Sequence, residues 1–111
     1  MKNYIQPGNT ITLTAPYVVT SGDGLLVGSI FGIASADAAS GETVEATLVG
    51  VFDLKKVASQ AWTAGDKIYW DNTNKEVTKT ATSNTLIGVA VVAVAGGASD
   101  TLGQVRLNGA F

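Results

Sequence analysis

The ten residues Leu25-Leu-Val-Gly-Ser-Ile-Phe-Gly-Ile-Ala34 are almost entirely apolar. A helix that spans a membrane needs roughly 20 residues, so this run is too short to be one. Its β-branched and aromatic residues instead favour a buried strand. A second apolar run, Thr85–Ala95, is even more hydrophobic and predicts the central strand of a sheet. Two such runs in 111 residues indicate a β protein with a substantial core.

The sequence on either side of these runs also predicts strands. Thr10–Ala15 begins with strict alternation of threonine and apolar residues, which is typical of a half-buried strand. The segments Lys67–Asp71 and Lys75–Thr80 flank a short polar connection and predict a hairpin. Two further strands are expected at Thr43–Leu54 and Gln104–Asn108. We therefore predict an all-β fold, a small compact β-barrel or sandwich with at most one short helix.

The helix is expected at Lys55–Trp62, which mixes Lys, Ala, Gln and Val without glycine or proline. The chain is interpreted as a single domain, residues 1–111, whose residues 1–9 form an extended N-terminal arm. Glycine recurs inside three similar apolar stretches, at Gly28, Gly50 and Gly88. Glycine weakens a strand, so these positions predict a bulge or a corner where backbones approach closely. A duplicated unit is the alternative interpretation.

Composition excludes several kinds of chemistry. The chain has no histidine and no cysteine, which removes His-based catalysis, thiol chemistry and most transition-metal sites. Seven scattered basic and nine acidic residues give a net charge of −2, which argues against binding nucleic acid or an anionic membrane. The segment Asp71–Glu76 superficially resembles a calcium loop, but Lys75 stands at a ligand position. No phosphate-binding loop is present. We expect no enzyme activity, catalytic residue, cofactor or metal.

Aromatic and terminal apolar residues are the candidate contact points. Tyr69 and Trp70 are consecutive in a predicted strand, so one should face the core and the other solvent. Exposed aromatic residues often anchor interfaces, although packing at sheet edges is the alternative. Apolar residues near chain ends are often held against a neighbour. The predicted protein-interface residues are Tyr4, Ile5, Trp62, Trp70 and Phe111.

Seven stretches along almost the whole chain carry a family resemblance. They are Tyr4-Ile-Gln-Pro-Gly8, Val27-Gly-Ser-Ile-Phe-Gly-Ile-Ala34, Gly41-Glu-Thr-Val44, Gly50-Val-Phe-Asp-Leu-Lys55, Ala64-Gly-Asp-Lys-Ile-Tyr-Trp-Asp71, Thr85-Leu-Ile-Gly-Val-Ala90 and Val105-Arg-Leu-Asn-Gly109. In their order and spacing they resemble the bacteriophage capsid cement, or head decoration, protein family. Some members of that family carry the label of a RecA/RadA-type recombinase, and the missing phosphate-binding loop argues against that label for this chain.

The resemblance implies a structural virion protein that binds the outer surface of the phage head and stabilises contacts between capsomers. It implies no cofactor and no catalytic residues. The implied partners are the major capsid protein and further copies of this chain, as dimers or trimers. The implied location is the capsid surface of a virion assembled in the bacterial host cytoplasm.

Two other functions remain open from the residues alone. A non-catalytic ligand- or carbohydrate-binding β module would use exposed Trp62 and Trp70 as stacking platforms on one concave face. A carboxylate-only enzyme would need two acidic side chains converging in a cleft.

Overall fold

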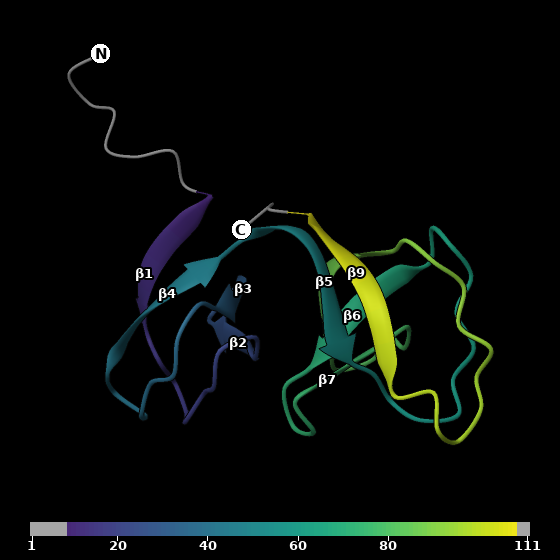
Figure 1. Ribbon diagram of the computed structural model, residues 1–111, viewed down its shortest axis with the longest axis horizontal. Coiled ribbons are helices and arrows are strands. Elements are labelled where there is room, and N and C mark those ends of the chain that lie inside the picture. The colour runs from purple at the N-terminus through teal and green to yellow at the C-terminus, as the bar shows by residue number, and fades with distance from the viewer. Residues whose placement is uncertain (1–8, 109–111) are drawn as a thin grey trace, which may run out of the picture.

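Nine β-strands form the regular structure of residues 9–108, the range that this computed structural model describes (Figure 1). Every strand pair is antiparallel, and no helix occurs in this range. The all-β prediction is confirmed. The first sheet has the order β1 (Thr10–Thr14), β4 (Thr43–Thr47), β3 (Ile30–Ala34), β2 (Gly24–Val27); the second has the order β5 (Val49–Lys55), β9 (Leu102–Asn108), β8 (Thr85–Ala90), β6 (Lys67–Asp71), β7 (Glu76–Thr78).

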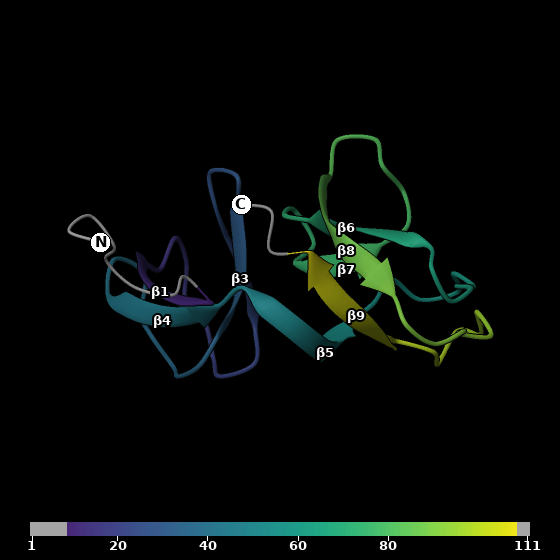
Figure 2. The same cartoon turned by 90° about the horizontal axis from the view of Figure 1, so that it is seen from above.

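The β2–β3 hairpin lies between two hydrophobic clusters, one on each of its faces. Leu25 packs into the cluster of the first sheet. Phe31 and Ile33 belong instead to the cluster built mainly by the second sheet, and Leu26 packs against it. Since successive side chains of a strand point to opposite faces, one short hairpin can contribute to both cores. The two sheets form the two lobes seen in Figures 1 and 2, with this hairpin as part of their contact.

The second sheet curls back on itself. Its edge strands β5 and β7 are joined by a parallel bridge between Lys56 and Val77, and the Val57 amide donates to the Val77 carbonyl at 3.0 Å. The most apolar run, predicted as a central strand over Thr85–Ala95, supplies β8, which is central in this sheet but ends at Ala90. The result is a partly closed barrel around a tryptophan-containing core.

Two predicted strands are each divided in the structure. Leu25–Ala34 turns back on itself at Gly28, whose φ of 60° lies in the left-handed region that suits glycine. Thr43–Leu54 is interrupted at Leu48, and its two halves belong to different sheets. Leu48 is buried, and its amide donates to the Asn9 carbonyl at 2.8 Å. The segment Thr43–Leu54 therefore carries the chain from one lobe to the other.

The helix predicted at Lys55–Trp62 was wrong. Lys56 is only 1% exposed, and its ammonium group donates to the carbonyls of Val57 at 2.6 Å and Asp100 at 3.0 Å. Ser59 has a φ of 60°, which a helix does not allow. Tertiary hydrogen bonds to the ammonium group and the backbone conformation at Ser59 thus override the local helix propensity.

Gly88 confirms the expectation of a close backbone approach. A Cβ atom there would lie 2.0 Å from the carbonyl oxygen of Arg106 on the adjacent strand. The β6–β8 pairing also shifts register between Ile68 and Tyr69, which marks a bulge. Gly28 lies in a turn and Gly50 lies in β5 with a φ of 124°. The three glycines therefore have different roles, which contradicts the alternative of a duplicated unit.

We predict that Gly88→Ala lowers the free energy of unfolding by about 3 kcal/mol, because the obstacle to the new methyl group is backbone rather than a movable side chain. Gly97→Ala is the matched control, since its Cβ would meet only the Asp100 carboxylate, at 3.1 Å. Urea unfolding of both variants measures the difference. Equal stability of the two variants contradicts the close approach of β8 and β9.

Candidate functional site

Three of the five predicted contact residues, Tyr4, Ile5 and Phe111, lie outside the described residues, as does most of the predicted arm. The other two, Trp62 and Trp70, are buried in the second lobe, with exposed fractions of 2% and 3%. Each indole N–H is hydrogen-bonded near its own strand or loop: Trp62 Nε1 to Gln60 Oε1 at 2.9 Å and Trp70 Nε1 to Asn72 Oδ1 at 3.0 Å. Neither indole forms part of the exposed surface of the single chain.

The burial of the tryptophans has a clear cause in the fold. Trp70 faces inward from β6 and packs on Phe31 with ring centroids 5.0 Å apart, while Tyr69 points to the other side of the sheet and is half-buried. This is the alternation expected for consecutive strand residues. The carbohydrate-binding alternative required exposed indoles on a concave face, and the structure contradicts that requirement.

The outward side of the second sheet is the strongest candidate contact surface, and we call it the outer face. It comprises the solvent-side residues Val49, Val51, Lys67, Leu86, Val89, Leu102 and Arg106, together with the polar residues Asp53, Lys55, Gln104 and Asn108 on the same side of β5 and β9. Register places Val51 opposite Arg106, Arg106 opposite Val89, and Val89 opposite Lys67. One row across the sheet therefore alternates apolar and cationic side chains.

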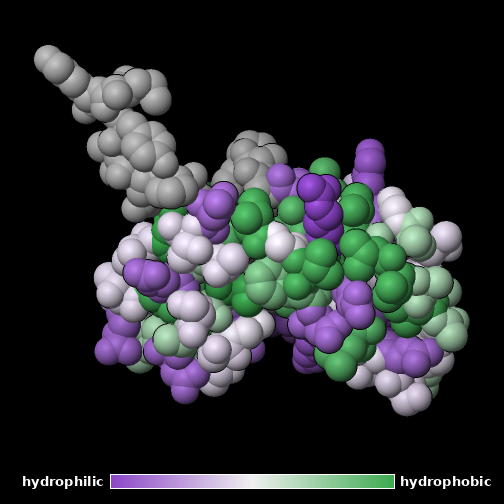
Figure 3. All heavy atoms as spheres, turned by 45° about the horizontal axis from the view of Figure 1, so that its top comes forward, coloured by the Kyte–Doolittle hydropathy of each residue, from purple (hydrophilic) through white to green (hydrophobic). Residues whose placement is uncertain are grey.

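Exposed apolar surface is concentrated on the outer face. Six large apolar residues are exposed among the described residues, and four of them are Val49, Val51, Leu86 and Leu102. Val51 is 54% exposed and Leu102 is 62% exposed. Figure 3 shows apolar side chains gathered over this lobe, with polar groups between them. Clustered apolar exposure of this kind is typical of protein interaction sites.

A shallow hollow of about 160 Å³ opens on the outer face. Leu86 and Val89 line its apolar part, and Lys67 and Arg106 contribute positive charge. Gly88 also lines it. The hollow therefore suits an apolar side chain that is accompanied by a carboxylate.

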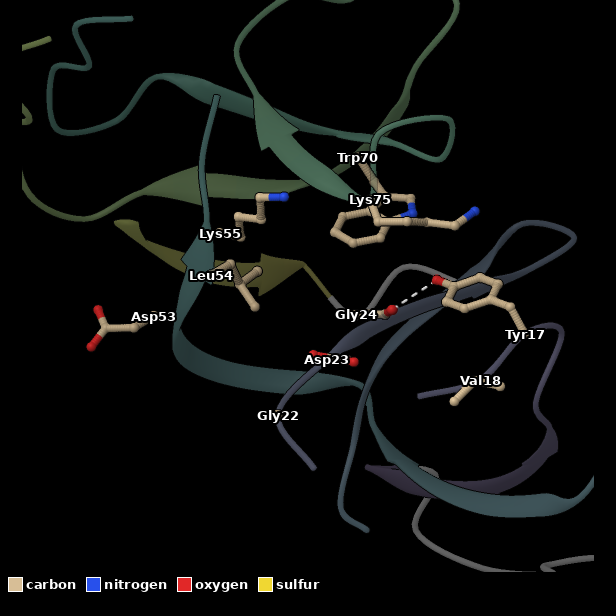
Figure 4. A pocket seen from close by; sticks show the side chains of 10 residues that line it. All are labelled: Tyr17, Val18, Gly22, Asp23, Gly24, Asp53, Leu54, Lys55, Trp70 and Lys75. Atoms are coloured by element: carbon tan, nitrogen blue, oxygen red, sulfur yellow. Dashed lines mark hydrogen bonds between the residues drawn. The ribbon is translucent and has the colours of Figure 1, made fainter. Parts of the chain in front are cut away.

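A second depression, of about 280 Å³, lies between the two lobes (Figure 4). Tyr17 from the first lobe donates its hydroxyl proton to the Gly24 carbonyl at 2.8 Å. The Lys75 ammonium group lies 4.1 Å from the centre of the Tyr17 ring, a cation–π contact between the lobes. Asp23, Asp53 and Lys55 add charges of both signs to the lining. This interlobe cleft is held by contacts within the chain.

Two groups near the cleft have shifted acidities. Burial and the neighbouring Asp23 carboxylate raise the pKa of Tyr17 from 10.0 to about 12. Hydrogen bonds from the Asn74 side chain and backbone lower the pKa of the Asp71 carboxyl group. Within residues 9–108, no three acidic side chains come together in a way that could hold a metal ion.

The outer face was not found from the sequence. One strand of this face has a recognisable sequence pattern. In Leu102–Asn108, Gly103, Val105 and Leu107 are buried and the residues between them are exposed. That pattern could have placed Arg106 on the surface. It could not have placed Val51, Val89 and Lys67 beside it, because this depends on strand order and register.

The family model described as phage cement protein matches residues 5–107. No curated protein matches the chain. In the described part of the chain, no helix has the length and hydrophobicity needed to cross a membrane.

We predict that Tyr17 ionises near pH 12 and that the protein loses stability between pH 10 and 12. In this range the unfolded chain has already lost the Tyr17 proton and the folded chain has not, so the free energy of unfolding falls as pH rises. Tyrosinate absorbance is followed against pH for the parent and for Tyr17→Phe, and the difference between the two curves gives the titration of Tyr17 alone. Asp23→Asn should move its pKa part of the way back. A Tyr17 pKa near 10 contradicts the buried geometry.

Proposed function

The chain belongs to the phage cement protein family, and on this premise we propose that it binds the outer surface of an assembled phage head and reinforces the contacts between capsomers. Membership supports a structural role in the phage capsid. The position on the outside of the head and the stabilisation of capsomers are the parts that we infer.

The observation that supports this proposal most strongly is the composition of the outer face. Its exposed valines and leucines lie on a hydrogen-bonded sheet, so they lose little freedom when a partner covers them. An apolar centre with arginine nearby also resembles the buried core of protein interfaces. This surface is therefore suited to docking on another protein.

The chemistry of the outer face suggests what it contacts on the head. Arg106 and Lys67 border the hollow. On β5, Lys55 and the acidic residue Asp53 lie on the same side of the sheet as Arg106. The chain as a whole carries a net charge of −2, so this surface differs in sign from the rest. We infer that it binds a site of the major capsid protein that presents carboxylates beside apolar side chains.

A modest affinity at each site is sufficient for this role. A head presents the same site many times, and a cement protein that also contacts its neighbours gains from effective concentration. Rigidity of the bound unit matters more than tight binding at one point. The cation–π contact of Lys75 with Tyr17 and the packing of Phe31 on Trp70 supply such rigidity by joining the two lobes.

We propose that the chain has no catalytic activity and needs no cofactor. In the interlobe cleft the Tyr17 hydroxyl is already bound to the Gly24 carbonyl, and the Lys75 ammonium group contacts the Tyr17 ring. The interpretation of residues 1–111 as one domain, with residues 1–9 as an arm toward neighbouring subunits, is retained as part of the proposal. The site of action is the virion capsid surface, reached during assembly in the bacterial host.

We predict that Val51→Glu weakens binding to heads that lack this protein by about tenfold or more, because it places a carboxylate at the centre of the docking surface. Val18→Glu is the matched control, since Val18 is 71% exposed but lies on the first lobe. Co-sedimentation with purified heads measures both. Parent-like binding by Val51→Glu removes the outer face from the contact, and failure of the parent to bind removes the cement role itself.

A second pair of variants tests the charge of the docking surface. Lys67→Glu should reduce binding and reduce its dependence on salt, because Lys67 borders the hollow. Lys79→Glu makes the same change at an exposed lysine that pairs with Asp66 and does not line the hollow. Heads saturated with the parent should also withstand heating better than bare heads. Equal loss from both lysine variants contradicts a localised cationic contact.

A further inference from the structure

The strand β1 differs from the other edge strands of the described residues in having no protection. An unprotected edge presents free N–H and C=O groups that can pair with another chain, and proteins usually block it with charge, proline, shortness or a covering segment. On β2, the Gly24 carbonyl accepts the Tyr17 hydroxyl. On β5, Asp53 and Lys55 supply charge, and the three-residue β7 is joined to Val57. β1 is five residues long and uncharged.

The hydrogen-bonding direction of β1 follows from its pairing with β4. The Leu48 amide donates to the Asn9 carbonyl at 2.8 Å, and the Ala15 amide donates to the Glu42 carbonyl at 2.8 Å. In an antiparallel ladder only alternate residues bond to a given neighbour. The even-numbered residues Thr10, Thr12 and Thr14 therefore direct their N–H and C=O groups away from β4, toward the open edge.

The sequence of β1, Thr10-Ile-Thr-Leu-Thr14, reads almost the same in both directions. If two copies pair antiparallel about Thr12, threonine lies opposite threonine on the solvent side and Ile11 lies opposite Leu13 of the second copy on the core side. Threonine pairs across strands are favourable, and the apolar pair extends the first cluster. No charge is placed opposite a like charge at the joining strands.

We propose that a second copy of this chain docks on β1, so that the two first sheets join into one continuous eight-stranded sheet across a twofold axis. The twofold axis is perpendicular to the joined sheet. The core-facing side of the first sheet therefore lies on the same side of the dimer in both copies. The surface used is separate from the outer face, so the dimer can form whether or not the outer face binds heads. The free edge of β1 is then the surface through which copies of this chain associate.

Charge sets the conditions for this dimer. Residues 9–48 contain four acidic residues and no basic one: Asp23, Asp37, Glu42 and Glu45. The carboxylate nearest the joint, Glu45, lies opposite Thr12 on β4, so the two Glu45 side chains are separated by three strand spacings, or roughly 14 Å. At that distance salt screens their repulsion. Added sodium chloride should therefore strengthen the dimer, unlike one held by ion pairs.

The test uses cysteine as a probe, because the chain has none of its own. In the proposed pairing the two Thr12 residues exchange hydrogen bonds, with Cα atoms about 5.5 Å apart, which is within the range for a disulfide. Thr12→Cys should form a disulfide-linked dimer under mild oxidation. Thr43→Cys, on the same side of the sheet but on the inner strand β4, should not.

Two further variants guard against accidental cross-linking. Sedimentation of the 11.3 kDa parent should show a mass that rises toward twice this value with concentration and with salt. Thr12→Lys should abolish the rise by placing like charges opposite one another, and Thr43→Lys should preserve it, with circular dichroism confirming that both fold. A monomeric parent, equal cross-linking of the two cysteine variants, or a dimer unaffected by Thr12→Lys each overturns the proposal.

Discussion

Both faces of the β2–β3 hairpin pack against a hydrophobic core, and the rest of the structure depends on this. Leu25 fills the core of the first lobe, whereas Phe31 on the opposite face packs against Trp70 of the second. Neighbouring glycines leave no spare room: a Cβ at Gly24 would lie 2.8 Å from the Phe31 ring, and one at Gly32 would lie 2.8 Å from the Ala46 methyl group. The first lobe thus supplies part of the core of the second, and the sheets form one unit.

This double burial also explains which parts of the fold can be predicted from the sequence. Thr10–Thr14 and Leu102–Asn108 face solvent on one side, so their alternation reports strands directly. The β6–β7 hairpin has a recognisable polar turn and was predicted from it, although its second strand is Glu76–Thr78 and not Lys75–Thr80. Leu25–Ala34 has no alternation because both faces are buried, so its turn is hidden within an apolar run. Similarly, nothing local marks Leu48 as the point where the chain changes sheets.

The candidate site was harder to predict than the fold. The sequence favours the aromatic residues as interface anchors. Trp62 and Trp70 are large enough to form the core of a short barrel, however, and they are buried there. The residues of the outer face are unremarkable valines, a lysine and an arginine. They form a surface only because β5, β9, β8 and β6 are adjacent in this order and register. Exposure of Val51 is likewise a property of the pairing with β9, which no local pattern encodes.

The central claim is that the protein meets the phage head through the outer face of its second sheet. An electron cryomicroscopy reconstruction of decorated heads, at a resolution that traces the strands, tests this directly. The account predicts that β5, β9 and β8 lie against the capsid shell, with Val51 and Arg106 at the contact and capsid carboxylates near Arg106. A reconstruction in which this face points to solvent, with another surface on the shell, contradicts it.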